Sequence, residues 1–156
     1  MRRLGLVLLV LLGWSLAPSV VLADAGGLSS SDIAIYKQAF AAVSKDRWAD
    51  AMAIAQKAKN PLPRKVILWL NLTRPGPGRS FDEITAFMAK NPKWPRMGAL
   101  QAQAERAMPE GMPAKSVIAW FNGRAPATSE GATRLVAALA ATGAAEPAAK
   151  TARAAW

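Results

Sequence analysis

Apolar side chains recur at spacings of three and four residues along most of this chain, and no segment alternates between apolar and polar residues long enough to form a strand. The first run after the N-terminal segment is Ile33, Tyr36, Phe40 and Val43, preceded by serines that can cap a helix. Such spacing places side chains on one face of an α-helix. The sequence therefore predicts an all-α protein.

Caps and helix breakers divide this pattern into short helices. Ala-Lys-Asn-Pro closes two of them, at residues 58–61 and 89–92, and prolines and glycines fill a loop at residues 74–78. Ser80 and Glu83 match a capping box, in which each side chain accepts the backbone amide of the other residue. Further helices are expected around residues 97–108, 117–122, 135–139 and 145–156.

Two sequence patterns that each occur twice indicate repeated helical pairs. The Ala-Lys-Asn-Pro closures start at residues 58 and 89, and the pattern Val-Ile-x-Trp-apolar-Asn at residues 66–71 returns at residues 117–122. Repeats of this length built from helical pairs form solenoids, in which each pair packs on its neighbours. We therefore expect helical hairpins stacked as a superhelix of the tetratricopeptide kind.

Residues 1–23 have the parts of a secretory signal peptide in the usual order. Two arginines precede an apolar run, and the small residues Val21 and Ala23 precede the expected cleavage point. The run is too short and interrupted for a stable membrane anchor, since crossing a bilayer takes about 20 apolar residues. We predict export to the periplasm and a mature domain of residues 24–156. The helical pattern still runs at Trp156, so this domain is expected to be cut short.

The amino-acid composition limits the catalytic and metal-binding sites that this chain can form. The chain has no cysteine and no histidine, which removes disulfides, the commonest metal ligand and the commonest general base. We predict no metal and no cofactor. The formal net charge is +10, and it attracts polyanions such as wall phosphates or the acidic peptide stems of the cell wall. The basic residues are scattered singly, so a solubilising surface is the simpler interpretation, and a nucleic-acid partner does not fit the export signal.

No acidic residue has the surroundings of a catalytic acid. Cleavage of a glycosidic bond needs a carboxyl group in an apolar pocket. Five acidic residues fall at predicted helix starts: Asp46, Asp50, Asp82, Glu83 and Glu130. Three more have polar or alanine-rich surroundings: Glu105, Glu110 and Glu146. We therefore predict no catalytic residue in this chain.

Tryptophans are the remaining candidates for binding. Four fall on apolar helical stripes, where packing in the core is expected: Trp48, Trp69, Trp120 and Trp156. Trp94 lies between Pro92 and Pro95 at a helix entrance. It is either a partly exposed ring on which a sugar can stack or a hydrophobic staple over the next helix. Trp94 is therefore our one candidate for a glycan contact.

Five segments together resemble a known family. They are residues 46–51, 68–73, 80–84, 91–95 and 119–124. They are similar to the N-terminal superhelical region of soluble lytic murein transglycosylases, and the resemblance covers residues 28–156. Asn-Pro-Lys-Trp-Pro and Ala-Trp-Phe are its more specific parts.

The resemblance implies a protein that works on peptidoglycan. Family members cleave the β-1,4 bond between N-acetylmuramic acid and N-acetylglucosamine with the glutamate of a Glu-Ser motif in a C-terminal lysozyme-like domain. No glutamate in this chain is followed by serine. We expect a periplasmic scaffold with weak, charge-assisted wall binding and no lytic activity from this chain alone. Its other expected partners are the catalytic domain or further periplasmic proteins.

A stand-alone periplasmic adaptor is the alternative. Helical-repeat proteins of this size bind other proteins on an extended surface, without any catalytic domain.

Overall fold

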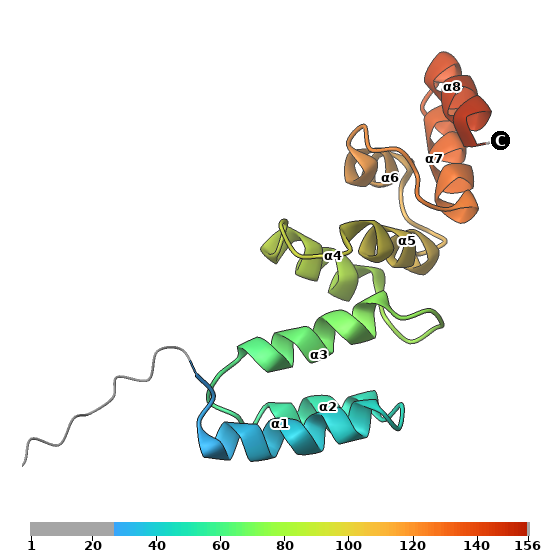
Figure 1. The fold of residues 1–156 in the computed structure, drawn as a ribbon. Coiled ribbons are helices and arrows are strands. Elements are labelled where there is room, and N and C mark those ends of the chain that lie inside the picture. Colours follow the sequence, from blue (N-terminus) through green and yellow to red (C-terminus); the bar gives the residue numbers. More distant parts are fainter. Residues whose placement is uncertain (1–26, 156) are drawn as a thin grey trace, which may run out of the picture.

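The computed structural model describes residues 27–155 (Figure 1). This part of the chain forms a stack of short helices and contains no strand, so the all-α prediction is confirmed. The helices are α1 (Ser30–Val43), α2 (Trp48–Ala55), α3 (Leu62–Thr73), α4 (Phe81–Lys90), α5 (Met97–Ala107), α6 (Ala114–Phe121), α7 (Ser129–Ala141) and α8 (Ala145–Ala155). The expected signal peptide, residues 1–23, lies outside the described residues.

The helices follow a regular pattern of neighbours. The odd-numbered helices α1, α3, α5 and α7 pack on one another in succession along the stack. Each even-numbered helix packs on an adjacent odd-numbered one: α2 on α1 and α3, α4 on α5, α6 on α7, and α8 on α7. The stack therefore runs from α1 and α2 at one end to α7 and α8 at the other (Figure 1).

Helix α3 contributes to both hydrophobic clusters of the described chain. Ile67 is buried with α1 and α2, whereas Leu72, five positions later, is buried with α4, α5, α6 and α7. Residues five apart on an α-helix point in different directions, so one helix serves two neighbours. Full burial of such a side chain is worth about 1.5–3 kcal/mol.

The buried face of α1 differs from the predicted one. Tyr36 is buried as expected, but Ile33 and Phe40 are 41% and 37% exposed. The other buried apolar residues of α1 are Ala39 and Ala42, which share a cluster with the alanines of α2. Small side chains let two helices approach closely, and here that contact orients α1.

Two side chains of α1 hold the loop between α2 and α3. The Asp32 carboxylate accepts hydrogen bonds from the backbone amides of Lys59 and Asn60, at 2.8 and 3.2 Å. The Tyr36 hydroxyl donates to the carbonyl oxygen of Asn60. Asp32 is only 4% exposed, and the bond from the Lys59 amide is the main reason why its pKa lies below the ordinary aspartate value.

The predicted capping box of α4 is confirmed. Ser80 and Glu83 form the complete capping box of α4, in which the Ser80 hydroxyl accepts the Glu83 amide and the Glu83 carboxylate accepts the Ser80 amide. The Thr128 side chain caps α7 by accepting the amide of Gly131. The loop predicted at residues 74–78 is also present.

Asp32 should make the stability of the protein depend on pH. Its carboxylate is favoured in the folded state, so it stabilises the fold fully above the unfolded pKa of about 3.9 and progressively less as pH falls through the lower folded pKa. We expect urea unfolding to show a smaller loss of stability in Asp32→Asn than in the wild type between about pH 6 and about pH 2.5.

Asp50→Asn is the matched control for this experiment. Asp50 is exposed and forms a surface ion pair with Arg47 at 3.5 Å. Such pairs contribute little, so this variant should keep the pH dependence of the wild type. The same pH dependence in all three proteins would contradict the assignment to Asp32.

Candidate functional site

A groove of about 390 Å³ lies between α2, α3 and α4. Its floor includes Leu68 and Phe87, and three cationic side chains line it: Arg64, Lys65 and Lys90. Glu83, which belongs to the capping box of α4, is the carboxylate in the lining. We call this the basic groove.

A second groove, of about 710 Å³, lies between α4, α5 and α6. Trp120 and two methionines provide its apolar surface, and Asp82, Thr85 and Arg124 provide polar groups. The Arg124 guanidinium lies 4.9 Å from the centre of the Trp120 ring. We call this the aromatic groove.

The Trp120 ring is fixed by two other aromatic rings. The Phe81 ring lies 5.4 Å from it, and the Phe121 ring lies edge-on at 4.8 Å. Both phenylalanines are buried in the main core cluster, and Trp120 is half-buried against that cluster. The expected core packing of Trp120 is thus present, but the same residue also lines a groove, which its apolar stripe did not indicate.

The two grooves adjoin along α4. Ala86, an exposed residue of α4, lines both of them. Because this side chain is only a methyl group, it forms a low ridge between the grooves. An elongated ligand that crosses α4 would therefore meet cationic groups on one side and an aromatic ring on the other.

Trp94 borders the basic groove through two of its lining residues. Its ring lies edge-on to Phe87 at 5.9 Å, and the ammonium of Lys65 lies 5.2 Å from the ring centre. The indole N–H is buried and has no hydrogen-bond partner. A sugar that stacks on the face under Lys65 has to displace this lysine, and the proposed glycan contact at Trp94 stays a prediction.

The other tryptophans have different environments. Trp69 is half-buried against the main core, and its indole donates to the carbonyl of Pro95 at 3.0 Å. Trp48 belongs to neither core cluster; its ring lies under the guanidinium of Arg74, 5.0 Å from the ring centre. The predicted core position of Trp48 is therefore wrong, because this residue begins α2 at the edge of the stack. Trp156 lies outside the described residues.

Glu105 is buried, which its polar and alanine-rich surroundings in the sequence did not indicate. Its exposure is 2%, and its carboxylate accepts the Ala127 amide at 2.9 and 3.0 Å and the Thr128 hydroxyl at 2.7 Å. The Gln101 amide also donates to it, at 2.8 Å. The carboxylate thus ties α5 to the start of α7, and hydrogen-bond donors occupy its oxygens.

The tie at Glu105 depends on the absence of a side chain at Gly131. A Cβ atom built there would lie 2.2 Å from the Glu105 carboxylate oxygen and 2.5 Å from its carbon. The carboxylate has little freedom to retreat, because four hydrogen bonds hold it. The close contact between α5 and α7 therefore requires glycine at this position.

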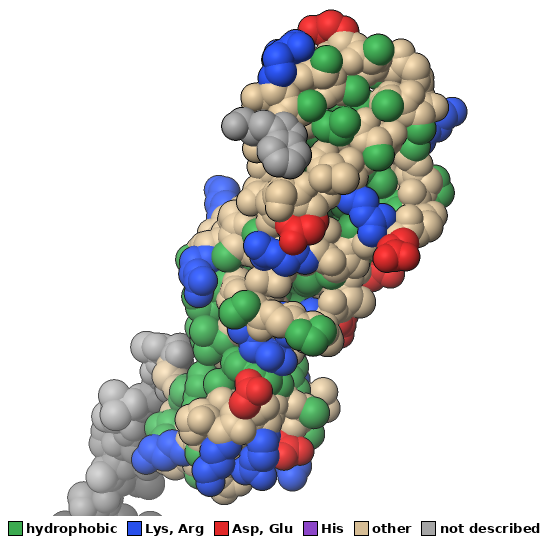
Figure 2. All heavy atoms as spheres, turned by 90° about the vertical axis from the view of Figure 1, so that its right-hand side faces the viewer, with side chains coloured by type: hydrophobic (Ala, Val, Ile, Leu, Met, Phe, Trp, Pro, Cys, Tyr) green, Lys and Arg blue, Asp and Glu red, His purple; other side chains and the backbone are tan. Residues whose placement is uncertain are grey.

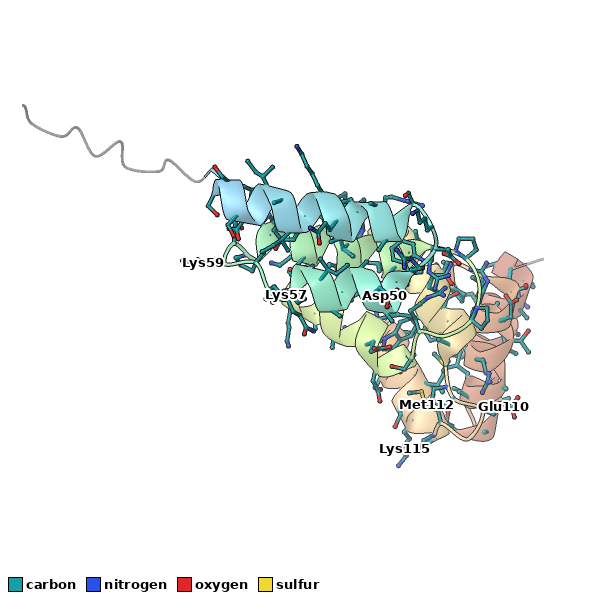
Figure 3. The ribbon with its side chains drawn as sticks, turned by 90° about the horizontal axis from the view of Figure 1, so that it is seen from below. Asp50, Lys57, Lys59, Glu110, Met112 and Lys115 are labelled. Atoms are coloured by element: carbon teal, nitrogen blue, oxygen red, sulfur yellow. The ribbon has the colours of Figure 1, made fainter. Side chains whose placement is uncertain are left out.

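The remaining acidic residues of the described chain lie at helix starts or on the surface. Asp50, Asp82, Glu83 and Glu130 lie in first turns of helices as predicted, and Asp46 lies just before α2. Glu110 and Glu146 are exposed. Figure 3 shows Asp50 and Glu110 far apart, on α2 and on the connection between α5 and α6. Within residues 27–155, no group of three or more potential ligands could hold a metal ion.

Basic side chains occur along the whole length of the stack. Figure 2 shows lysine and arginine side chains spread over one face, with the densest group at the end formed by α1 and α2. The spread over the stack was expected from the sequence, in which these residues are scattered singly, whereas the denser group at one end was not. None of the helices between residues 27 and 155 is long and apolar enough to span a membrane.

Comparisons with protein-family models, with curated proteins and with solved structures find no match for this chain.

Replacement of Glu105 by glutamine should destabilise the protein. The amide group of glutamine would bring a donor towards the Ala127 amide and the Thr128 hydroxyl, which need acceptors. Leaving buried partners unsatisfied costs about 1–3 kcal/mol each, so we expect a loss of roughly 2–3 kcal/mol in urea unfolding. Glu110→Gln, at an exposed position five residues later, should change stability by less than about 0.5 kcal/mol. Equal effects of the two replacements would show that the Glu105 carboxylate does not connect α5 to the start of α7.

Proposed function

We propose that this chain is the scaffold and wall-binding part of a periplasmic system related to soluble lytic murein transglycosylases, without an active site of its own. The main support for the proposal is the position of the segments that resemble this family. Residues 80–84, 91–95 and 119–124 come from three separate parts of the sequence, yet each lines the grooves beside α4: Asp82 and Glu83 from the first, Asn91 and Pro92 from the second, Trp120 and Arg124 from the third.

The chemistry of the aromatic groove suits a glycan. The C–H face of a sugar ring packs on an aromatic face such as that of Trp120, while hydroxyl and carboxylate groups of the ligand need polar partners. Asp82, Thr85 and Arg124 supply such partners in the same groove. The neighbouring basic groove adds positive charge for the acidic peptide stems of peptidoglycan.

The arrangement of neighbours supports a superhelix of the tetratricopeptide kind as part of this proposal. Successive packing of α1, α3, α5 and α7, with even-numbered helices on adjacent ones, is the neighbour pattern of a helical solenoid. Such a stack offers extended surfaces rather than one deep pocket, which fits a long polymer ligand.

Catalysis is not expected from Asp82 in the aromatic groove or from the buried Glu105. Asp82 is exposed in the first turn of α4, where it favours the helix dipole, and Glu105 is held by donors from α5 and from the start of α7. Neither carboxyl group has the apolar surroundings that keep a general acid protonated near neutral pH.

A groove at the far end of the stack favours the alternative, a protein-binding adaptor. It has a volume of about 620 Å³ between α6, α7 and α8, with Ile118, Leu135 and Leu139 as apolar lining. A groove of this kind accommodates an apolar segment of another protein. We rank this function second, because none of the resembling segments other than residues 119–124 contributes to the groove.

Sedimentation with purified peptidoglycan sacculi tests the main proposal. We expect weak binding that falls as salt is raised, because exposed charges are screened beyond about 8 Å at physiological ionic strength. Arg124→Gln should weaken binding by roughly five-fold, which corresponds to about 1 kcal/mol for one charged contact. Arg153→Gln, an equal change of charge in the last turn of α8, should weaken it by less than about two-fold.

Results of two kinds, on wall binding and on lytic activity, would contradict the proposal. No sedimentation at low salt, or equal losses for Arg124→Gln and Arg153→Gln, would mean that the grooves beside α4 do not bind the wall. Release of anhydro-muropeptides by the purified chain would overturn the statement that it lacks an active site.

A further inference from the structure

The loop between α3 and α4 folds around the guanidinium group of Arg79. Its two Nη atoms donate hydrogen bonds to the backbone carbonyls of Arg74, Gly76 and Pro77. The loop makes this turn with Gly76 and Gly78 at φ angles of 101° and 92°, which only glycine adopts readily. As a result Arg79 is only 8% exposed.

This buried cation has no anionic partner in the described chain. The ion pairs among residues 27–155 are Arg47 with Asp50 and a weak contact of Arg74 with Asp46. The Nε–H of Arg79 is buried and has no acceptor. Burial, together with the nearby charge of Arg74, lowers the pKa of Arg79 from its ordinary value.

Deprotonation cannot relieve the cost of burying the charge of Arg79. Guanidinium groups stay charged in proteins, and buried charges are normally paired. The backbone carbonyls compensate part of the cost through their dipoles, but they carry no net charge. The arrangement therefore leaves positive charge that an anion can balance.

A cavity of about 340 Å³ adjoins this arginine. Its lining comes from the loop at residues 76–79 and from Ile84, Gln103, Arg106 and Ala107. The charged residues in this lining are Arg79 and Arg106, and Gln103 adds a side-chain amide. The intrahelical bond from Arg106 to the carbonyl of Ala102 is long, at 3.5 Å, so its guanidinium is available to a ligand.

We propose that this cavity is a binding site for a phosphate group, held by Arg106 and Gln103 and stabilised by the unpaired positive charge of Arg79 in its wall. Two guanidinium groups match the charge of a dianionic phosphate, and arginine is the side chain best suited to phosphate oxygens. The amides of Gly76 and Gly78 form no hydrogen bond to the protein backbone and lie beside the same cavity. Carboxylates bear a single charge and have two oxygens, so they use fewer of these donors.

This site is separate from the proposed wall-binding surface. Its lining shares no residue with the basic groove or with the aromatic groove. The pKa of Glu130 at the start of α7 is lowered by hydrogen bonds from a backbone amide and from the Ser129 side chain, and then by the charge of Arg106. A phosphate group therefore competes with a weak charge interaction and not with a formed ion pair.

Titration with inorganic phosphate at constant ionic strength tests the proposal. The readout is the backbone amide NMR signals of Gly76, Gly78 and Arg79, which should shift and saturate. Arg106→Gln should weaken phosphate binding by about ten-fold, as expected for the loss of one charge-assisted contact. Arg153→Gln makes the same change of net charge on α8 and should leave the affinity within about two-fold.

Two controls make the outcome decisive. Thermal unfolding without phosphate should be unchanged in Arg106→Gln, because this side chain is exposed and makes only the long bond to Ala102. Acetate at the same concentration should shift the three amides much less than phosphate. Equal effects of Arg106→Gln and Arg153→Gln, equal responses to acetate and phosphate, or no shift at the three amides would overturn the proposal.

Discussion

The stack depends on the burial of both sides of α3. The helices between residues 27 and 155 are 8 to 14 residues long, and isolated helices of such length are marginal in water. Ile67 and Leu72 join the cluster around α1 and α2 to the cluster around α4 to α7. Among the described helices, α3 alone contributes buried residues to both clusters, so the packing of α1 and α2 against the rest of the stack depends on it.

Three buried charged side chains hold irregular segments that apolar packing alone does not fix. Asp32 accepts the amides of the loop after α2, Glu105 accepts donors at the start of α7, and Arg79 donates to the carbonyls of the loop after α3. Each satisfies backbone groups of an irregular segment that has no helical partner. The two carboxylates are matched by donors, whereas the charge of Arg79 has no anionic partner in the described chain, and this difference underlies the proposed phosphate site.

The two proposals use different parts of the molecule and can fail independently. The wall-binding proposal rests on three resembling segments that meet at the grooves beside α4. The phosphate proposal rests on the charge and hydrogen bonding of Arg79 and needs no assumption about the family. Binding at one site leaves the residues of the other free, since their linings do not overlap.

The sequence by itself indicated the helices and several of their ends, because these depend on neighbours along the chain. One predicted end is wrong: α2 ends at Ala55, before the Ala-Lys-Asn-Pro segment that was expected to close it. The capping box at Ser80 and the breaks at the proline-rich loops follow from local hydrogen bonding and backbone geometry. Which face of a helix is buried depends on the shape and distance of the partner helix, and local spacing does not encode it. Ile33 is therefore exposed beside buried alanines, and Glu105 is buried because α7 brings donors and a glycine against α5. Only the tertiary structure placed Trp120 in a groove, since its spacing in the sequence fits a core residue equally well.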